Sequence, residues 1–96
     1  MVVGILHVTL HLPGSHSLKE RRQVVGGLGR RLSRTFGVSA AEVGGQDLWQ
    51  VAELGVAFVG NAGRDTERVL QAVTNYLQDR VEDAVVTSVI RETVRL

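Results

Sequence analysis

The sequence predicts a ferredoxin-like βαββαβ fold, in which a four-stranded antiparallel sheet carries both helices on one face. Three segments alternate apolar and polar residues with the period of two that is typical of strands, a shorter segment is a plausible fourth strand, and two segments repeat apolar residues at helical spacing. Two βαβ halves with right-handed crossovers close into this arrangement. The 96 residues, 44% of them hydrophobic, predict a single ferredoxin-like domain over 1–96.

The first half of the chain predicts a strand followed by a helix. Residues 2–12 alternate as a half-buried strand does. The helix is expected from Ser17 to about Phe36 and starts with a capping box. In this motif the Ser17 hydroxyl accepts from the Glu20 amide, and the Glu20 carboxylate reaches back to the Ser17 amide. Gly37 is expected to end the helix.

The second half predicts two longer strands and a second helix. Residues 38–43 form a short strand and the segment GGQDLWQ a loop, after which residues 50–60 alternate as a strand. Helical spacing predicts a helix over about 65–79. A last strand is expected over about 84–94. One face of it is expected to carry Val86, Ser88, Ile90, Glu92 and Val94.

Charge is unevenly distributed along the chain. Residues 15–36 hold six Lys and Arg against one acid, although the whole chain has a net charge of only +1. Helical spacing gathers Lys19, Arg22, Arg30 and Arg34 on one face. This face is interpreted either as a phosphate-contacting surface for nucleic acid, with salt-dependent affinity, or as an ordinary solvated helix face.

The segment before the helix is a second candidate site. Ser15, His16, Ser17 and Arg21 stand where helix amides favour a bound anion. Capping competes with this interpretation, because it already uses the Ser17 oxygen. Arg21 also projects onto the apolar side of the helix, so it needs an acidic partner or a ligand. An enzyme acting on a phosphorylated ligand at the Gly14 to Ser17 corner ranks last, since no catalytic constellation is identifiable, and no catalytic residue is assigned.

The sheet face that the helices leave open is expected to expose His7, Thr9, His11 and Glu53. It lacks the aromatic residues on which RNA-recognition folds stack bases. A second subunit is expected to cover it, which predicts a homodimer. A metal held by His7, His11 and Glu53 is geometrically conceivable, but histidines on strands are more often surface or interface residues, so no metal is assigned.

The only tryptophan, Trp49, lies in the segment QDLWQ. Its ring either stacks on a base or anchors an interface. Alternatively it folds back and closes the end of the core, with Asp47 as a turn or cap residue, and this is the favoured prediction.

The composition also excludes several classes of function. The chain has no cysteine, which excludes disulfides, thiolate metal sites and cysteine nucleophiles. The start MVVGILHVTLHL is too short and too polar for a membrane span and lacks a basic n-region, so a strand is expected there. This composition is compatible with an intracellular protein, and no cofactor, membrane contact or sequence-specific DNA motif is predicted.

Two segments carry a resemblance to a known family. The stretches GILHVTLHLPGSHSLKERR and AEVGGQDLWQVAELGVAFV resemble the YlxP-like family of small uncharacterised bacterial proteins, over nearly the whole chain. The resemblance implies a ferredoxin-like fold and a cytoplasmic bacterial protein. Family members are often encoded near genes for transcription, translation initiation and ribosome maturation, which implies a connection with RNA or the ribosome. No catalytic residue comes with the resemblance.

The leading hypothesis is a non-catalytic protein that binds RNA or the ribosome through the basic helix face. Contacts to phosphates give affinity but read no sequence, so specificity would come from RNA shape or from the Trp49 loop. The alternative is a homo-oligomeric interaction module that uses the open sheet face.

Overall fold

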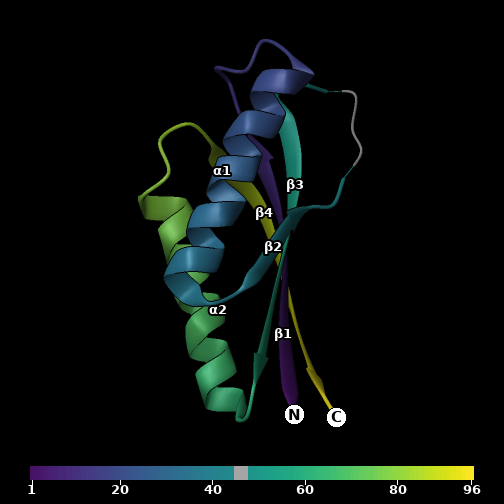
Figure 1. Ribbon diagram of the computed structural model, residues 1–96, viewed down its shortest axis with the longest axis vertical. Coiled ribbons are helices and arrows are strands. Elements are labelled where there is room, and N and C mark those ends of the chain that lie inside the picture. The colour runs from purple at the N-terminus through teal and green to yellow at the C-terminus, as the bar shows by residue number, and fades with distance from the viewer. Residues whose placement is uncertain (45–47) are drawn as a thin grey trace.

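The computed structural model describes residues 1–44 and 48–96 and has the predicted βαββαβ order (Figure 1). The elements are β1 (Val2–His11), α1 (Leu18–Phe36), β2 (Ser39–Glu42), β3 (Val51–Gly60), α2 (Gly63–Asp79) and β4 (Val85–Arg95). The strands form one antiparallel sheet in the order β2-β3-β1-β4, with β2 and β4 at its edges. Both helices cover the same face of this sheet, which confirms the ferredoxin-like prediction.

The core lies between the helices and the sheet. Even-numbered residues of β1 face the helices, and the register carries this alternation across the sheet, because Leu6 stands opposite Val56 and Val8 opposite Leu54. The buried apolar side chains of the core are Leu6, Val8, Leu10, Leu12, Val25, Leu28, Leu32, Val38, Ala52, Leu54, Val56, Leu70, Val73, Leu77 and Ala84. Each large side chain of this kind contributes about 1.5–3 kcal/mol when it leaves water.

Both ends of α1 are capped. The Ser17 hydroxyl accepts from the Glu20 amide at 3.1 Å, as predicted. The Glu20 carboxylate accepts from the His16 amide at 2.7 Å, one residue earlier than the Ser17 amide that the capping box predicts. At the other end, Gly37 adopts the left-handed region with φ 67° and donates its amide to the Ser33 carbonyl at 3.0 Å.

A bulge in β4 changes which of its residues face the helices. Leu10 pairs with Val86, whereas the preceding residue of β1 pairs with Ser88, so Thr87 is the extra residue. As a result Val86 and Val89 both pack against the core. The single alternation predicted for this strand is therefore wrong at its start, because Val86 does not share a face with Ser88. The pattern predicted for the rest of the strand holds from Ser88 onward.

Candidate functional site

The basic face of α1, formed by Lys19, Arg22, Arg30 and Arg34, is exposed along its length. Within residues 1–44 and 48–96, none of these four cations forms an ion pair. Their helical positions lie away from the face that buries Leu28 and its neighbours. The basic face therefore exposes four positive charges to solvent, and none of them pairs with an acidic side chain among the described residues.

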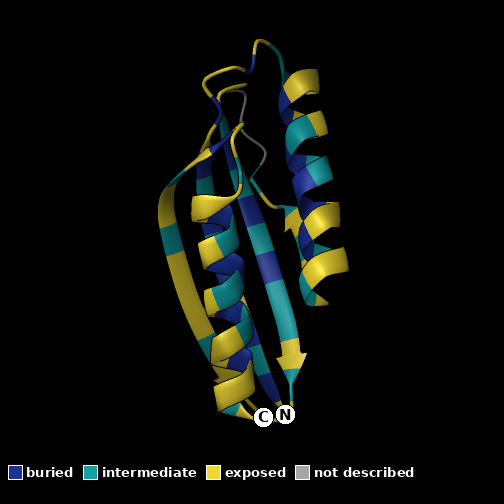
Figure 2. Cartoon of the chain, turned by 90° about the vertical axis from the view of Figure 1, so that its left-hand side faces the viewer, coloured by how far each residue is buried: buried dark blue, intermediate teal, exposed yellow. Residues whose placement is uncertain are grey.

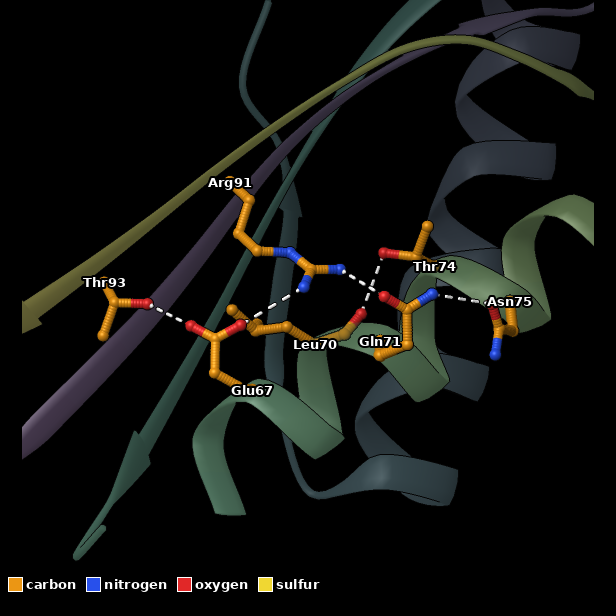
Figure 3. A network of polar contacts seen from close by, with 7 residues as sticks. All are labelled: Glu67, Leu70, Gln71, Thr74, Asn75, Arg91 and Thr93. Carbon is orange, nitrogen blue, oxygen red and sulfur yellow. Dashed lines mark hydrogen bonds and ion pairs between the residues drawn. The ribbon is translucent and has the colours of Figure 1, made fainter. Parts of the chain in front are cut away.

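Arg91 on β4 is used differently, as Figure 3 shows. The Arg91 guanidinium contacts the Glu67 carboxylate at 3.2 Å and the Gln71 amide oxygen at 3.0 Å, so it joins β4 to α2. The Thr93 hydroxyl donates to the same carboxylate at 2.9 Å. The sequence analysis missed this network, because it depends on which strand lies beside α2. Arg91 is thus engaged inside the domain, unlike the cations of the basic face.

A groove of about 600 Å³ separates α1 from the edge strand β2. Its lining consists of Val25, Gly26, Gly29, Arg30, Ser33 and Arg34 on α1 and Ala40, Ala41 and Glu42 on β2. The helix and strand approach closely at Gly29, where a Cβ atom would lie 3.6 Å from the Ala40 carbonyl oxygen. Two of the four cations of the basic face therefore border a concave surface.

The predicted anion site at the start of α1 is surrounded by acids. Ser15 is buried, and the amide of His16 is already bound by the Glu20 carboxylate. A hollow of about 400 Å³ beside this corner is lined by Glu20, Glu82 and Asp83. Three carboxylates raise the electrostatic cost of an anion here, so the contacts favour capping.

Arg21 has a structural role instead of the predicted anion-binding one. Its side chain is 1% exposed, and its guanidinium pairs with the Glu42 carboxylate at 2.6 Å. The same guanidinium donates to the carbonyls of Leu48 at 3.1 Å and Val51 at 3.3 Å. Arg21 therefore ties α1 to β2 and to the segment before β3, which explains why a cation lies on the apolar side of the helix.

The open face of the sheet consists of the odd-numbered residues of β1 and their partners on β3 and β4. Figure 2 shows β4 coloured largely as exposed. The exposed apolar side chains of this face and its rim are Ile5, Val43, Val59, Val85, Ile90 and Val94. The described residues of the face include no Lys or Arg. An exposed surface of this composition is typical of an interaction site.

Polar residues occupy the middle of the open face, where the sequence analysis placed them. His7 Nε2 lies 3.0 Å from Glu53 Oε1 across the β1–β3 pair, and Thr9 faces the same side. His11 lies further along β1, at the edge of a separate hollow. The described residues contain no group of three or more side chains able to hold a metal.

Trp49 is 48% exposed, so the favoured prediction that it closes the end of the core is wrong. Its ring lines a hollow of about 450 Å³ with His11, Leu48, Gln50 and Val51. Because His11 and Val51 belong to the open face, the hollow continues that face toward the segment before β3. The predicted turn residue Asp47 lies outside the described residues.

Together, the fold and these surfaces define a small α+β protein of ferredoxin-like architecture with a basic helix face and an apolar open sheet. The chain belongs to the DUF503 family, described as proteins of unknown function, which matches residues 3–90. The chain is 39% identical over 76 residues to the uncharacterized protein YlxP of Bacillus subtilis (strain 168). That alignment covers 79% of this chain and 83% of YlxP. The resemblance drawn from the two sequence segments is thereby confirmed.

A structural comparison leads to the same fold. The chain is similar to the solution NMR structure of the de novo designed protein LFR1 1, which has a ferredoxin fold, with a TM-score of 0.57. The two chains share 9% sequence identity, and the match covers 100% of this chain and 88% of the designed one. At this identity the similarity concerns the fold alone.

No helix among the described residues has the length and apolar character needed to cross a membrane.

Proposed function

We propose that this protein is a non-catalytic, cytoplasmic binding protein that associates with RNA, ribosomal RNA included, through the basic face of α1. One observation carries the proposal: four exposed cations lie along one helix without an acidic partner among the described residues. A helix face that serves only solubility usually mixes both signs of charge. Phosphate groups are the partner that such a row of cations fits.

The proposal predicts a strong salt dependence. With four phosphate contacts to an unpaired strand, affinity should fall about 50-fold between 50 and 200 mM monovalent salt. Fluorescence anisotropy with a labelled single-stranded RNA across this range measures the effect. A flat response to salt would contradict the proposal.

Charge reversal on α1 tests whether binding depends on the basic face or only on the net charge of the protein. The variant carrying Arg30→Glu and Arg34→Glu should lose affinity by on the order of 10- to 100-fold. The matched control carries Arg64→Glu and Arg80→Glu, which make the same change in net charge at the two ends of α2. Equal losses in both variants would show that only net charge matters, and would count against the basic face as the site.

A second candidate function is a homodimer that forms through the open face. Ile90 is 60% exposed and Val59 is 64% exposed, although both belong to strands of the sheet. Exposed apolar side chains gain about 25 cal/mol per Å² when a partner covers them. Sedimentation at high protein concentration tests this candidate, and a monomer there would remove it.

A phosphate-ligand enzyme at the Gly14 to Ser17 corner receives little support. The hydroxyl of Ser17 already caps α1, and the neighbouring hollow is lined by acids. An anionic substrate would meet repulsion there.

A further inference from the structure

The groove between α1 and β2 gives the basic face a concave surface in addition to its positive charge. Resting on the proposed function, we propose that this groove binds an unpaired stretch of RNA, with a base in the groove and the flanking phosphates on Arg30 and Arg34. The partner is thereby narrowed from RNA in general to single-stranded segments such as loops and bulges.

Three small residues line the groove, and we refer to them as its floor. Gly26 and Gly29 belong to the helix, and Ala40 supplies a methyl group from the strand. A volume of about 600 Å³ lies within the range of about 300–1,000 Å³ that is usual for small-ligand pockets. A planar base fits such a floor, whereas it would collide with larger side chains.

Two cations stand on one rim of the groove at a spacing of four residues. Arg30 and Arg34 therefore lie about one helical turn apart, about 6 Å along the axis, which is comparable to the separation of neighbouring phosphates in a strand. The Arg30 guanidinium folds back over the helix, since its Nη1 lies 3.5 Å from the position that a Cβ atom of Gly26 would occupy. A guanidinium plane beside the floor also offers a surface on which a base can stack.

The acid on the opposite wall does not repel an anion at full strength. Glu42 lines the groove, but its carboxylate is paired with the buried Arg21 guanidinium at 2.6 Å. This pair offsets the negative charge of the wall. The groove therefore keeps a positive balance from Arg30 and Arg34.

The edge of β2 supplies hydrogen-bonding groups for a base. Val43 donates its amide to the Glu53 carbonyl, and partners in an antiparallel ladder alternate between bonded and non-bonded pairs. The backbone groups of Ala40 and Glu42 therefore point away from β3, and the Ala40 carbonyl lies beside Gly29. These groups can pair with the edge of a base that is not already paired.

A duplex cannot place a base in this groove. In A-form RNA the bases are paired and stacked inside the helix, and the major groove is too deep and narrow for side chains to read. A duplex would contact the cations through its phosphates alone and leave the groove empty. Unpaired bases, by contrast, can splay out and enter it.

The decisive variant fills the groove without changing charge. Gly26→Leu places a side chain over the floor, and the space beside its Cβ is limited only by the flexible end of Arg30. Gly27→Leu is the matched control, because Gly27 is the next residue of α1 but does not line the groove. Ser33→Leu is a second groove-filling variant, and circular dichroism checks that all three are folded. Leucine is a better helix former than glycine, so α1 is expected to be retained.

The probes are a single-stranded 10-nucleotide RNA and a fully paired 10-base-pair RNA, measured at one salt concentration by fluorescence anisotropy. The wild-type protein should bind the single strand at least tenfold more tightly. Gly26→Leu and Ser33→Leu should lose at least tenfold for the single strand and less than twofold for the duplex, while Gly27→Leu should resemble the wild type.

The two levels of the proposal fail in different ways. If the wild type binds both RNAs equally and groove filling changes nothing, the groove inference is overturned, while RNA binding by the basic face stands. If neither RNA binds, both the proposed function and the groove inference are overturned. If only an acidic peptide such as poly-glutamate binds and is displaced by Gly26→Leu, the groove is a protein-binding site and the inference is likewise overturned.

Discussion

The basic face of α1 and the open face of the sheet lie on opposite sides of one small domain and differ in almost every property. The helix face carries four cations that pair with no described acid. The open face carries exposed apolar side chains and, among its described residues, no Lys or Arg. A charged helix surface is stable in water alone, whereas exposed apolar area gains free energy when it is covered. This difference supports the proposal of two separate partners, a polyanion for the helix and a protein surface for the sheet.

One buried cation connects the two regions. Arg21 reaches from α1 to Glu42 on β2 and to the carbonyls of Leu48 and Val51, next to the exposed Trp49. The groove wall and the hollow at the end of the open face thus depend on the same side chain. We therefore expect the largest effect of a single substitution at the pair that Arg21 forms with Glu42.

Removing the Glu42 carboxylate should reduce the stability of the whole domain. Glu42→Ala removes the carboxylate that pairs with the buried Arg21 guanidinium, and breaking such a pair costs about 3–5 kcal/mol. The lower end applies because the Glu42 side chain is 23% exposed. Thermal unfolding should show a decrease in Tm of about 12 °C or more. Arg21→Met should cost less, because it removes the charge together with its need for a partner; an equal or larger loss would show that the hydrogen bonds to the carbonyls matter more.

The open face should lose self-association when a charge is placed on it. Ile90→Glu combined with Val59→Glu puts two carboxylates into a surface that a second copy would have to desolvate. Sedimentation equilibrium should show the dimer dissociation constant raised by about 100-fold or more. Gln78→Glu, an exposed change on α2, is the control. If RNA affinity per protomer falls equally in the sheet variant, the separation of the two faces is wrong.

A single cation of the basic face should contribute one phosphate contact. Arg34→Ala should reduce the slope of log K against log salt by about 0.7 for a single-stranded probe. Sedimentation should show an unchanged oligomeric state, because Arg34 lies on α1 and not on the open face. An unchanged slope would remove Arg34 from the phosphate-contacting set.

The smallest effect is expected at the start of α1. Ser17→Ala removes the oxygen that accepts from the Glu20 amide and should cost about 1 kcal/mol of unfolding free energy. Because the hydroxyl is used for capping, RNA affinity should change less than twofold. A large loss of affinity with normal stability would instead support the anion site predicted at Ser15, His16 and Ser17.

The fold could be predicted from the sequence because it depends on periodicity. The alternation of β1 and the helical spacing of α2 each predict an element without knowledge of its neighbours. The bulge at Thr87 has no such signal, since it exists only in the pairing of β4 with β1. The same limit applies to Arg21: helical spacing places it on the apolar side of the helix, but its partner Glu42 lies 21 residues away.

The candidate site was predictable only in part. Charge and helical spacing predict the basic face, and alternation predicts His7, Thr9 and Glu53 on the open face. The groove was not predictable, because it needs β2 to be an edge strand beside α1. Glycines in a helix permit a close approach to another backbone, but Gly26 and Gly29 do not identify that backbone or the space that remains beside it. Trp49 was assigned to the core, since large aromatic residues are usually well buried.

RNA is expected to contact the basic face of α1 and not the open face of the sheet. Backbone amide NMR during titration with single-stranded RNA reports both regions in one experiment, since α1, β2 and β4 give separate signals. We predict chemical-shift changes that concentrate between residues 18 and 42 and are absent from the outward residues of β4, from Ser88 to Val94. Changes centred on β4 and the open face, or none at saturating RNA, would contradict it.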